Sequence, residues 1–425
     1  IFKKAGILNF MDEGELIQAA TAFASQPIPK GNRVGIITNT GGPAVIATDV
    51  LVGAGLELPP LSEKTEALLK ENLYPEASVH NPVDVLATGP GAHYRVCLDA
   101  MMDDDNFDAV LVHFVTPFFV DNESTAKEIV AVSQQQKKPM VCNLMTDRRQ
   151  WTEVVKILQE GGVPCFALPG EAARAMTALV NYHNIRTRQI GKVQTFGGTD
   201  SAGARQILAA AKEAGKSNLP AESVYGILAA YKIPTAAWQT AKNAEAAVAA
   251  AAEIGYPAVV KADAASILHK SDMGGVAVDL KDGDAVRATV EKMQQRFPDD
   301  DLSFFTQQYL PGGLELIMGA KAEEGLGHAV MFGLGGIFVE IMKDVVFNLT
   351  PVTSGEAGQM LSAIKGASML AGVRGQKGVN QDMVIEIIQR LSQLLTDLPE
   401  IQEMDLNPLI AFEDQVVVVD ARIAI

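Results

Sequence analysis

Short apolar segments alternate with segments of helical periodicity through the first half of the chain. Residues 33–38, 107–114 and 139–144 are nearly continuous apolar runs, which is typical of strands buried on both faces of a sheet. Helices are predicted between and after these runs, at about 44–53, 124–136, 151–161 and 171–186. A parallel sheet with helices on both faces accommodates this order of elements. The first half is therefore predicted to be an α/β domain.

The pattern changes after residues 191–206, which mix Gly, Ser, Thr and Asp without periodicity and are interpreted as linker. Beyond them, helices are predicted at about 222–231 and 241–254, followed by a strand at 257–262. Further strands then follow one another without helices between them, and a long amphipathic helix precedes a predicted C-terminal hairpin at 404–423. Consecutive strands beside separate helices are typical of an α+β domain.

The composition argues against several classes of partner. The 425 residues carry 35 Lys and Arg against 51 Asp and Glu, which gives a formal net charge of −16 and a sequence pI near 4.9. Such an acidic chain is not expected to bind nucleic acid or an anionic membrane. The three cysteines form no CxxC pattern, and no signal peptide or membrane-length apolar run is found in the sequence. A cytoplasmic protein is predicted, and the start at Ile1 indicates part of a longer chain.

The first candidate site is the segment Asn39-Thr40-Gly41-Gly42-Pro43, between the first predicted strand and the helix after it. Glycines in this position let backbone N–H groups approach an anion where the helix dipole favours negative charge. The segment also follows the carboxyl end of a strand, where open α/β sheets bind ligands. A tight turn that needs glycine only for its backbone geometry is the alternative interpretation.

The second candidate lies between Lys261 and Gly275. Lys261 is near the end of an apolar strand, where burying a lysine is unfavourable unless it meets an anion. The following loop ends in Gly274-Gly275, as expected of a flexible cover over phosphates. It contains His269, whose neutral imidazole could accept a phosphoryl group near neutral pH. The alternatives are a lysine that reaches solvent from the end of its strand and an ordinary surface histidine.

The third candidate is a set of acidic and amide side chains. Glu315 lies between two leucines in a predicted strand, and Asp405 and Asn407 lie two residues apart in another. Side chains two apart in a strand share one face. Carboxylate and amide oxygens are hard ligands suited to Mg²⁺, which in turn binds nucleotide phosphates. The alternative is a solvated strand face, which the apolar neighbours of Asp405 and Asn407 make less favourable.

Eight segments of the chain match motifs of one known family. In the first half they are RVGIITNTGGP (33–43) and SVHNPVDV (78–85). In the second half they are GYPAVVK (255–261), ILHKSDMGGV (267–276), PGGLE (311–315), MFGLGGIFV (331–339), VRG (373–375) and MDLNPL (404–409). Together they resemble the NDP-forming acyl-CoA synthetases, which are acid–thiol ligases such as the ADP-forming acetate–CoA ligases and are related to succinyl-CoA synthetase. The resemblance covers nearly the whole chain.

The resemblance implies a flavodoxin-like CoA-ligase domain at 29–190, a linker at 191–219 and an ATP-grasp domain at 220–425, with 1–28 as the end of a preceding succinyl-CoA-ligase-like domain. It implies reversible conversion of acyl-CoA, ADP and phosphate into free acid, CoA and ATP through an acyl phosphate and a phosphohistidine. The principal phosphorylated histidine and the CoA-binding domain are then expected upstream or on another subunit of an oligomer. This chain would supply nucleotide binding and phosphoryl transfer.

The resemblance also implies a role for each candidate residue. His269 is expected to act as a further phosphoryl acceptor, and Asp405 and Asn407 to hold Mg²⁺. The residues expected to bind the nucleotide are Lys261, Gly274, Gly275, Gln307, Gln308, Tyr309, Glu315 and Arg374. Those expected to present a helix N-terminus to the phosphate on the phosphohistidine are Asn39, Gly41 and Gly42. Such electrostatic positioning is most of what phosphoryl transfer requires from a protein.

One position departs from the family pattern, because Asn348 stands where an arginine usually follows Val345-Val346-Phe347. If that arginine assists phosphate binding, nucleotide affinity or turnover is expected to be weaker here, with Arg374 compensating in part. The motifs specify neither the acyl group nor the choice between ADP and GDP.

Two other functions are compatible with parts of the pattern. The same two-domain arrangement resembles a regulatory module of bacterial protein lysine acetyltransferases, whose acetyltransferase domain would lie outside these residues. An ATP-grasp ligase that joins a carboxylate to an amine is the third possibility. The NTGGP segment makes that third possibility less favoured, and the retained HKSD and DLNP motifs favour the acyl-CoA synthetase.

Overall fold

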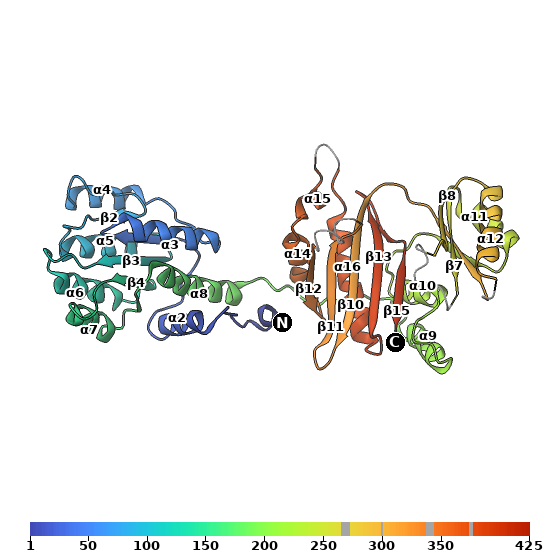
Figure 1. The fold of residues 1–425 in the computed structure, drawn as a ribbon, viewed down its shortest axis with the longest axis horizontal. Helices are drawn as coiled ribbons and strands as arrows, with labels where there is room; N and C mark the ends of the chain where they lie inside the picture. The colour runs from blue at the N-terminus through green and yellow to red at the C-terminus, as the bar shows by residue number, and fades with distance from the viewer. Residues whose placement is uncertain (265–272, 299–300, 337–343, 374–376) are drawn as a thin grey trace. The chain divides into compact units, whose positions relative to one another are not determined.

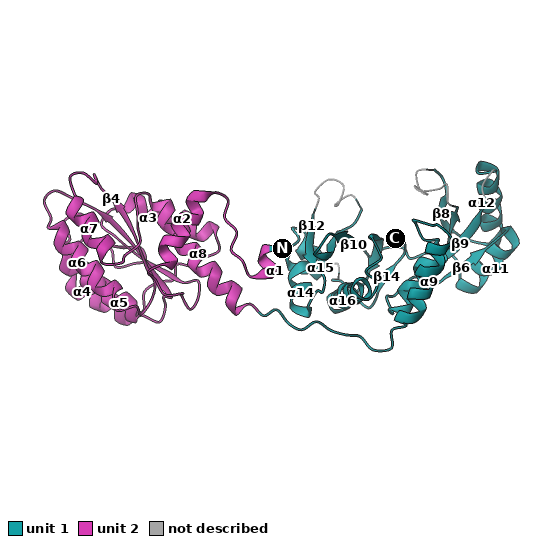
Figure 2. Ribbon diagram, turned by 90° about the horizontal axis from the view of Figure 1, so that it is seen from below, with its two compact units in different colours: residues 1, 189–425 teal, residues 2–188 magenta. Residues whose placement is uncertain are grey.

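The chain forms two compact units, one of residues 2–188 and one of residues 189–425 together with Ile1 (Figure 2). The residues that the computed structural model describes are 1–264, 273–298, 301–336, 344–373 and 377–425. Within these ranges, none of the helices combines the length and the apolarity that crossing a membrane requires. Each unit has hydrophobic cores built from its own residues.

The unit of residues 2–188 is built around a parallel five-stranded sheet in the order β2-β1-β3-β4-β5 (Figure 1). Its strands are β1 (Val34–Thr38), β2 (Val83–Asp84), β3 (Ala109–Val115), β4 (Met140–Met145) and β5 (Cys165–Phe166). The chain passes from β1 to β2 on one side and then to β3 on the other, so the topological switch point lies between β1 and β3. This is the flavodoxin-like order, which confirms the predicted α/β fold.

Helices cover both faces of this sheet because the strand residues alternate between two cores. In β3, Ala109 and Leu111 belong to one core, whereas Val110, Val112 and Phe114 belong to the other. The helices on the first face are α2 (Glu13–Phe23), α3 (Gly41–Gly53) and α8 (Pro169–Thr187). Those on the second face are α4 (Glu63–Asn72), α5 (Gly91–Asp103), α6 (Asn122–Ser133) and α7 (Thr152–Glu160).

The N-terminal segment joins this unit, although residues 1–28 were predicted to end a preceding domain. A short helix, α1 (Phe2–Ala5), precedes α2. Ala22 of α2 is fully buried in the same core as α3 and α8, and α2 packs along α8. The segment therefore contributes a helix to the parallel-sheet unit.

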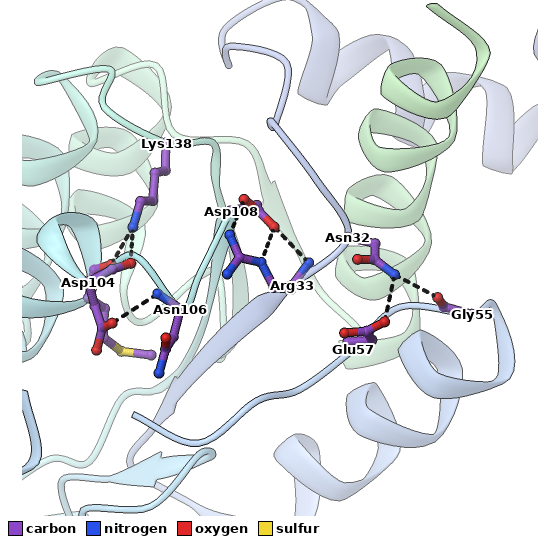
Figure 3. A network of polar contacts seen from close by, with 9 residues as sticks. Asn32, Arg33, Gly55, Glu57, Asp104, Asn106, Asp108 and Lys138 are labelled. Atoms are coloured by element: carbon purple, nitrogen blue, oxygen red, sulfur yellow. Dashed lines mark hydrogen bonds and ion pairs between the residues drawn. The ribbon is translucent and has the colours of Figure 1, made fainter. Parts of the chain in front are cut away.

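An ion pair fastens the amino-terminal ends of β1 and β3 (Figure 3). The Arg33 guanidinium donates to both carboxylate oxygens of Asp108, at 2.8 and 2.9 Å, and the Arg33 backbone N–H donates at 3.1 Å. The Asp108 side chain is 8% exposed and that of Arg33 is 39% exposed. Burial alone would raise the pKa of Asp108, but the hydrogen bonds and charge of Arg33 outweigh it and hold this pKa below its ordinary value.

The unit of residues 189–425 contains two antiparallel sheets. The small sheet has the order β6-β9-β7-β8, with strands β6 (Trp238–Ala241), β7 (Ala258–Asp263), β8 (Val276–Leu280) and β9 (Ser303–Gln308). Helices α11 (Ala244–Ile254) and α12 (Gly283–Arg296) pack on one of its faces. Ala258, Val260 and Ala262 face these helices, so Lys261 points to the opposite face.

The large sheet has the order β12-β11-β10-β13-β14, and β15 also pairs with β13 (Figure 1). Its strands are β10 (Leu314–Glu323), β11 (Gly327–Leu334), β12 (Val345–Leu349), β13 (Glu403–Ala411), β14 (Val416–Val418) and β15 (Ala421–Ala424). One face is covered by α14 (Ser354–Ala363), α15 (Ala367–Ala371) and α16 (Gln381–Asp397). We call the opposite face the far face.

The predicted linker is more structured than expected. Residues 201–213 form helix α9 (Ser201–Glu213), which packs with α10 (Ala221–Ala230) and buries Ala204, Leu208 and Ala211 in the core of the large sheet. The stretch before α9 also binds this unit, since the Phe196 ring lies 4.1 Å from the Arg390 guanidinium on α16. Residues 201–213 of the predicted linker are therefore helical, and the predicted domain boundaries stay predictions.

Candidate functional site

Two of the predicted acidic side chains lie on the far face of the large sheet. Leu316 and Met318 of β10 point into the helix-covered core, so Glu315 and Gly319 point to the far face. Asp405 of β13 pairs with Gly319 and shares that face. Glu315 is four residues further along β10, about 13 Å away at 3.3 Å per residue. Asp405 and Glu315 thus share one surface but do not form one cluster.

A bulge distorts β13 next to Asp405. Leu406 and Leu409 are both buried in the core, so Asn407 and Pro408 occupy the place of a single residue opposite Ile317. The side chain of Asn407 is exposed. The distortion extends to the neighbouring chain segment, because Pro408 O accepts the backbone N–H of Val419 at 3.1 Å.

The predicted C-terminal hairpin is wrong in one respect that matters for the site. Residues 416–423 were expected to form one strand, but the structure has two, β14 and β15, with Val419 and Asp420 between them. These two residues leave the ladder because they face the bulge, where the Asn407 N–H donates to Asp420 O at 3.1 Å. The break joins the Asp420 backbone to that of Asn407, and sequence reasoning missed Asp420.

Lys261 reaches this break from the small sheet. Its Nζ donates to Val419 O at 2.5 Å and lies 3.3 Å from Asp420 Oδ1. The Lys261 side chain is 10% exposed and that of Asp420 is 33% exposed. A buried ammonium requires such partners. Lys261 and Asn407, predicted separately from sequence, thus both contact Asp420, the first at its carboxylate and the second at its backbone carbonyl.

The electrostatics around Asp405 favour a bound cation. The pKa of Asp405 is raised to about 6, mainly by burial, while Arg422 lowers it and the charges of Asp420 and Glu403 raise it. A carboxylate whose ionisation is unfavourable in the free protein gains from a divalent ion nearby. Among the described residues, no three His, Cys, Asp or Glu side chains group to enclose a metal. Asp405, Asn407 and Asp420 supply only oxygen donors, which fits Mg²⁺ bound partly by substrate phosphates and water.

The predicted adenine-side residues lie at the end of β9. Gln307 is buried and its Nε2 donates to the Tyr225 hydroxyl at 3.1 Å, so its side chain is engaged within the protein. Gln308 is exposed, and its N–H donates to Ala237 O at 2.9 Å. The Tyr309 N–H donates to Pro257 O at 3.3 Å. Their expected contacts with a base stay predictions.

The structure describes only some of the remaining residues that are predicted to bind the nucleotide. Gly275 O accepts the Ala262 N–H at 2.7 Å, which ties the Gly274-Gly275 turn to the end of β7 near Lys261. Glu315 is exposed and lies against Gly336, where a Cβ would come within 2.8 Å of Glu315 Oε2. His269 and Arg374 lie outside the described residues.

The Asn39 side chain joins two strands of the parallel sheet. In the parallel-sheet unit, its amide accepts the Val115 N–H at 3.0 Å and donates to Val115 O at 2.8 Å. Both polar atoms of the buried Asn39 amide are therefore used to join the ends of β1 and β3. The expected part of Asn39 in presenting the N-terminus of α3 to a phosphate stays a prediction.

Gly41 and Gly42 begin α3 at the switch point between β1 and β3, and both are exposed. Neither has a positive φ, and a Cβ on either would meet nothing within 4 Å. The backbone therefore does not require glycine at these positions, contrary to the tight-turn interpretation. Thr40 at the N-cap provides no side-chain hydrogen bond, so the first N–H groups of α3 are left for another acceptor.

Asn348 does not lie on the same face of the large sheet as Asp405. It pairs with Val330, which is in the helix-covered core, so residue 348 points to the face opposite Asp405. Its Oδ1 accepts the Leu349 N–H at 2.9 Å. Phe347, the preceding residue, points to the far face and is 64% exposed. An arginine at 348 would have to pass around the edge strand β12 to reach the far face.

Comparison with known proteins covers both units. A Ligase-CoA domain family matches residues 34–190, and an ATP-grasp domain family matches residues 210–425, just over half of the chain. The chain is 34% identical over 418 residues to the ADP-forming 4-hydroxybutyrate–CoA ligase of Nitrosopumilus maritimus, an alignment that covers 97% of this chain and 60% of the relative. It is 32% identical over 428 residues to the ADP-forming acetate–CoA ligase I of Archaeoglobus fulgidus, covering 100% of this chain and 61% of the relative.

A solved structure from a related enzyme is also similar to part of this chain. A chain of acetyl-coenzyme A synthetase 1 from Ca. Korarchaeum cryptofilum, in complex with coenzyme A and Ca-AMPCP, is 36% identical with a TM-score of 0.50. The match covers 52% of this chain and 99% of that chain. This chain spans about 60% of the length of the curated relatives named above. With its Ligase-CoA and ATP-grasp domains, the chain belongs to the family of NDP-forming acyl-CoA synthetases.

Proposed function

We propose that this chain is the Ligase-CoA and ATP-grasp part of an ADP-forming acyl-CoA synthetase. The observation that carries the proposal is the convergence of Lys261, Asn407 and Asp405 around Asp420, in a chain related along its whole length to ADP-forming ligases. The overall reaction would interconvert acyl-CoA, ADP and phosphate with free acid, CoA and ATP. The named relatives are ligases, which favours this activity over a regulatory module of an acetyltransferase.

In the nucleotide site, each group has a distinct electrostatic task. Lys261 Nζ, held by Val419 O beside Asp420, would direct a remaining N–H toward nucleotide phosphates, adding a positive charge in a partly buried place. Asp405, Asn407 and Asp420 would hold Mg²⁺, which when bound neutralises phosphate charge during transfer. The exposed Glu315 would accept hydrogen bonds from the sugar.

Phosphoryl transfer would use histidines that the structure does not describe. We propose His269 as an acceptor next to the nucleotide, with Arg374 as a further phosphate ligand. In the other unit, the uncapped N–H groups of Gly41 and Gly42 would bind the phosphate on a phosphohistidine contributed from outside these residues. A CoA-binding domain, upstream or on another subunit, is required to complete the reaction. A division of the complete enzyme into separate chains is supported by the solved relative, because that whole chain matches only about half of this one.

The direct test is ATP formation by the complete protein from ADP, phosphate, Mg²⁺ and a panel of acyl-CoAs. We expect ATP with at least one acyl-CoA. In this chain alone, we expect binding of Mg·ADP in calorimetry that a Lys261→Met variant weakens about tenfold or more, because a charged hydrogen bond to phosphate is lost. A Lys232→Met variant serves as control for a lysine outside the site. Absence of nucleotide binding by the unaltered chain would exclude the proposal.

A further inference from the structure

Tyr225 on α10 connects separate parts of the nucleotide site, although neither its residue type nor its position suggested a role. Its side chain is 1% exposed. Its hydroxyl donates to Val419 O at 3.0 Å and accepts from Gln307 Nε2 at 3.1 Å. The same Val419 carbonyl accepts Lys261 Nζ at 2.5 Å. One carbonyl oxygen is thus the shared acceptor of the tyrosine and the lysine.

Aromatic packing fixes the place of this hydroxyl. The Tyr225 ring centroid lies 4.7 Å from that of Phe305 and 5.4 Å from that of Trp238, and the latter two rings stack at 5.1 Å. Both partners belong to the small sheet, on β9 and β6. A ring held from two sides has little freedom to move its hydroxyl. The position of the Tyr225 hydroxyl is therefore fixed where the small and large sheets meet.

The segment that carries Val419 is held at this junction by backbone bonds as well. Val418 N–H donates to Pro234 O at 2.9 Å, and Ala236 N–H donates to Val418 O at 3.1 Å. Val419 itself is outside the strand ladder, so its carbonyl depends on side-chain donors. Burial raises the pKa of Tyr225, so the hydroxyl remains a donor at physiological pH.

We propose that Tyr225 is a positioning residue for nucleotide binding. By fixing the Val419 carbonyl, its hydroxyl sets where Lys261 Nζ lies relative to the Asp420 carboxylate. By accepting a hydrogen bond from Gln307, the same hydroxyl connects Lys261 and Asp420 to the end of β9. The inference rests on the proposed function, because it concerns the same nucleotide site. It assigns a task to a side chain that touches neither phosphate nor metal.

The test compares two tyrosines of the same helix region by calorimetry with Mg·ADP as the probe. Tyr225→Phe is expected to weaken the affinity about fivefold, which is the loss that one misplaced hydrogen bond produces. Tyr231→Phe is the matched control, because Tyr231 is equally buried and its hydroxyl bonds to Asp397 Oδ2 at 3.1 Å, away from Lys261. We expect the control to change the affinity less than about twofold while removing a comparable hydrogen bond.

A double-mutant cycle separates positioning from a general effect on folding. If Tyr225 acts through Lys261, Tyr225→Phe has almost no effect on Mg·ADP affinity in a Lys261→Met background. Equal losses in both backgrounds, or equal losses from both tyrosine variants, would overturn the inference. If the unaltered chain binds Mg·ADP and Tyr225→Phe binds equally well, only the inference fails. If the unaltered chain does not bind, the proposed function fails.

The phenylalanine variant leaves the buried Gln307 amide without its acceptor, which could unfold the chain. The double variant Tyr225→Phe, Gln307→Leu removes both partners and leaves no unpaired buried group, a change that is close to neutral for folding. It still lacks the hydrogen bond to Val419 O. The same weakening of Mg·ADP binding is expected, and an unchanged affinity would again overturn the inference.

Discussion

At the scale of single residues, the Arg33–Asp108 pair gives a prediction about stability and pH. The pKa of Asp108 is lower in the folded protein than the ordinary value of about 3.9, so the pair stabilises the fold fully above that pH. The contribution is lost as pH falls through the folded-state pKa. Asp108→Asn is expected to lower the free energy of unfolding at pH 7 by about 2 kcal/mol, because charged hydrogen bonds to a buried carboxylate are lost.

Urea unfolding at pH 7 and at about pH 3 measures this contribution. The difference between the unaltered chain and Asp108→Asn should shrink at the lower pH. Asp103→Asn is the matched control, since Asp103 pairs with Lys137 at 2.6 Å but its side chain is 64% exposed. The control should change stability by less than about 1 kcal/mol. A pH-independent difference for Asp108→Asn would contradict the assigned ion pair.

Single residues of the candidate site differ in whether the sequence could predict them. Lys261 and Asp405 were predicted as site residues because a charged residue inside an apolar strand needs a partner, and these roles stay predictions. Asp420 was not, since it was placed inside a strand that the structure breaks. Tyr225 was not, because a tyrosine in an amphipathic helix is most often part of a core. Its packing against Phe305 bears that out, and only the hydroxyl's partners distinguish it.

At the scale of elements, α3 allows a test of why its first residues are glycine. A Cβ at Gly42 meets no atom and needs no unusual backbone angle, so Gly42→Ala should keep or increase stability, by up to about 1 kcal/mol. The added methyl group would lie where an anion approaches the first N–H groups. In the complete synthetase we therefore expect ATP formation to fall about tenfold to a hundredfold.

The opposite end of the same helix supplies the control for this prediction. Gly53, the last residue of α3, also has open space around an added Cβ and no positive φ. Gly53→Ala should stabilise the chain to a similar extent while leaving ATP formation unchanged. Thermal denaturation and the coupled assay measure both properties. Equal activity of the two variants would remove the N-terminus of α3 from the phosphate site.

Elements differ in how well the sequence predicts them. The strands of the parallel sheet were clear because burial on both faces leaves uninterrupted apolar runs, as in β3. The division of 416–423 into β14 and β15 could not be read locally. It is imposed by the bulge at Asn407 and Pro408 on the neighbouring strand, which is a non-local constraint. α9 was missed because the residues before it lack periodicity and the linker was taken to continue through it, although its apolar residues share one face.

At the scale of the whole molecule, the two units have independent cores. The cores around β1 to β5 contain only residues of 2–188, and those around the small and large sheets only residues of 204–423. The fold class of each unit was therefore predictable from its own pattern. The sequence contains no comparable signal for contacts between units.

This independence predicts that residues 189–425 fold alone and keep their ligand. Lys261, Asp405, Asn407, Asp420 and Tyr225 all lie in that unit, as do their hydrogen-bond partners. A fragment of residues 189–425 should bind Mg·ADP within about twofold of the affinity of the full chain, because no part of the nucleotide site is removed. Tyr225→Phe should weaken binding by the same factor in fragment and full chain. Calorimetry on both proteins, with circular dichroism to establish folding, measures this. A folded fragment that has lost Mg·ADP binding would show that the parallel-sheet unit contributes to the nucleotide site.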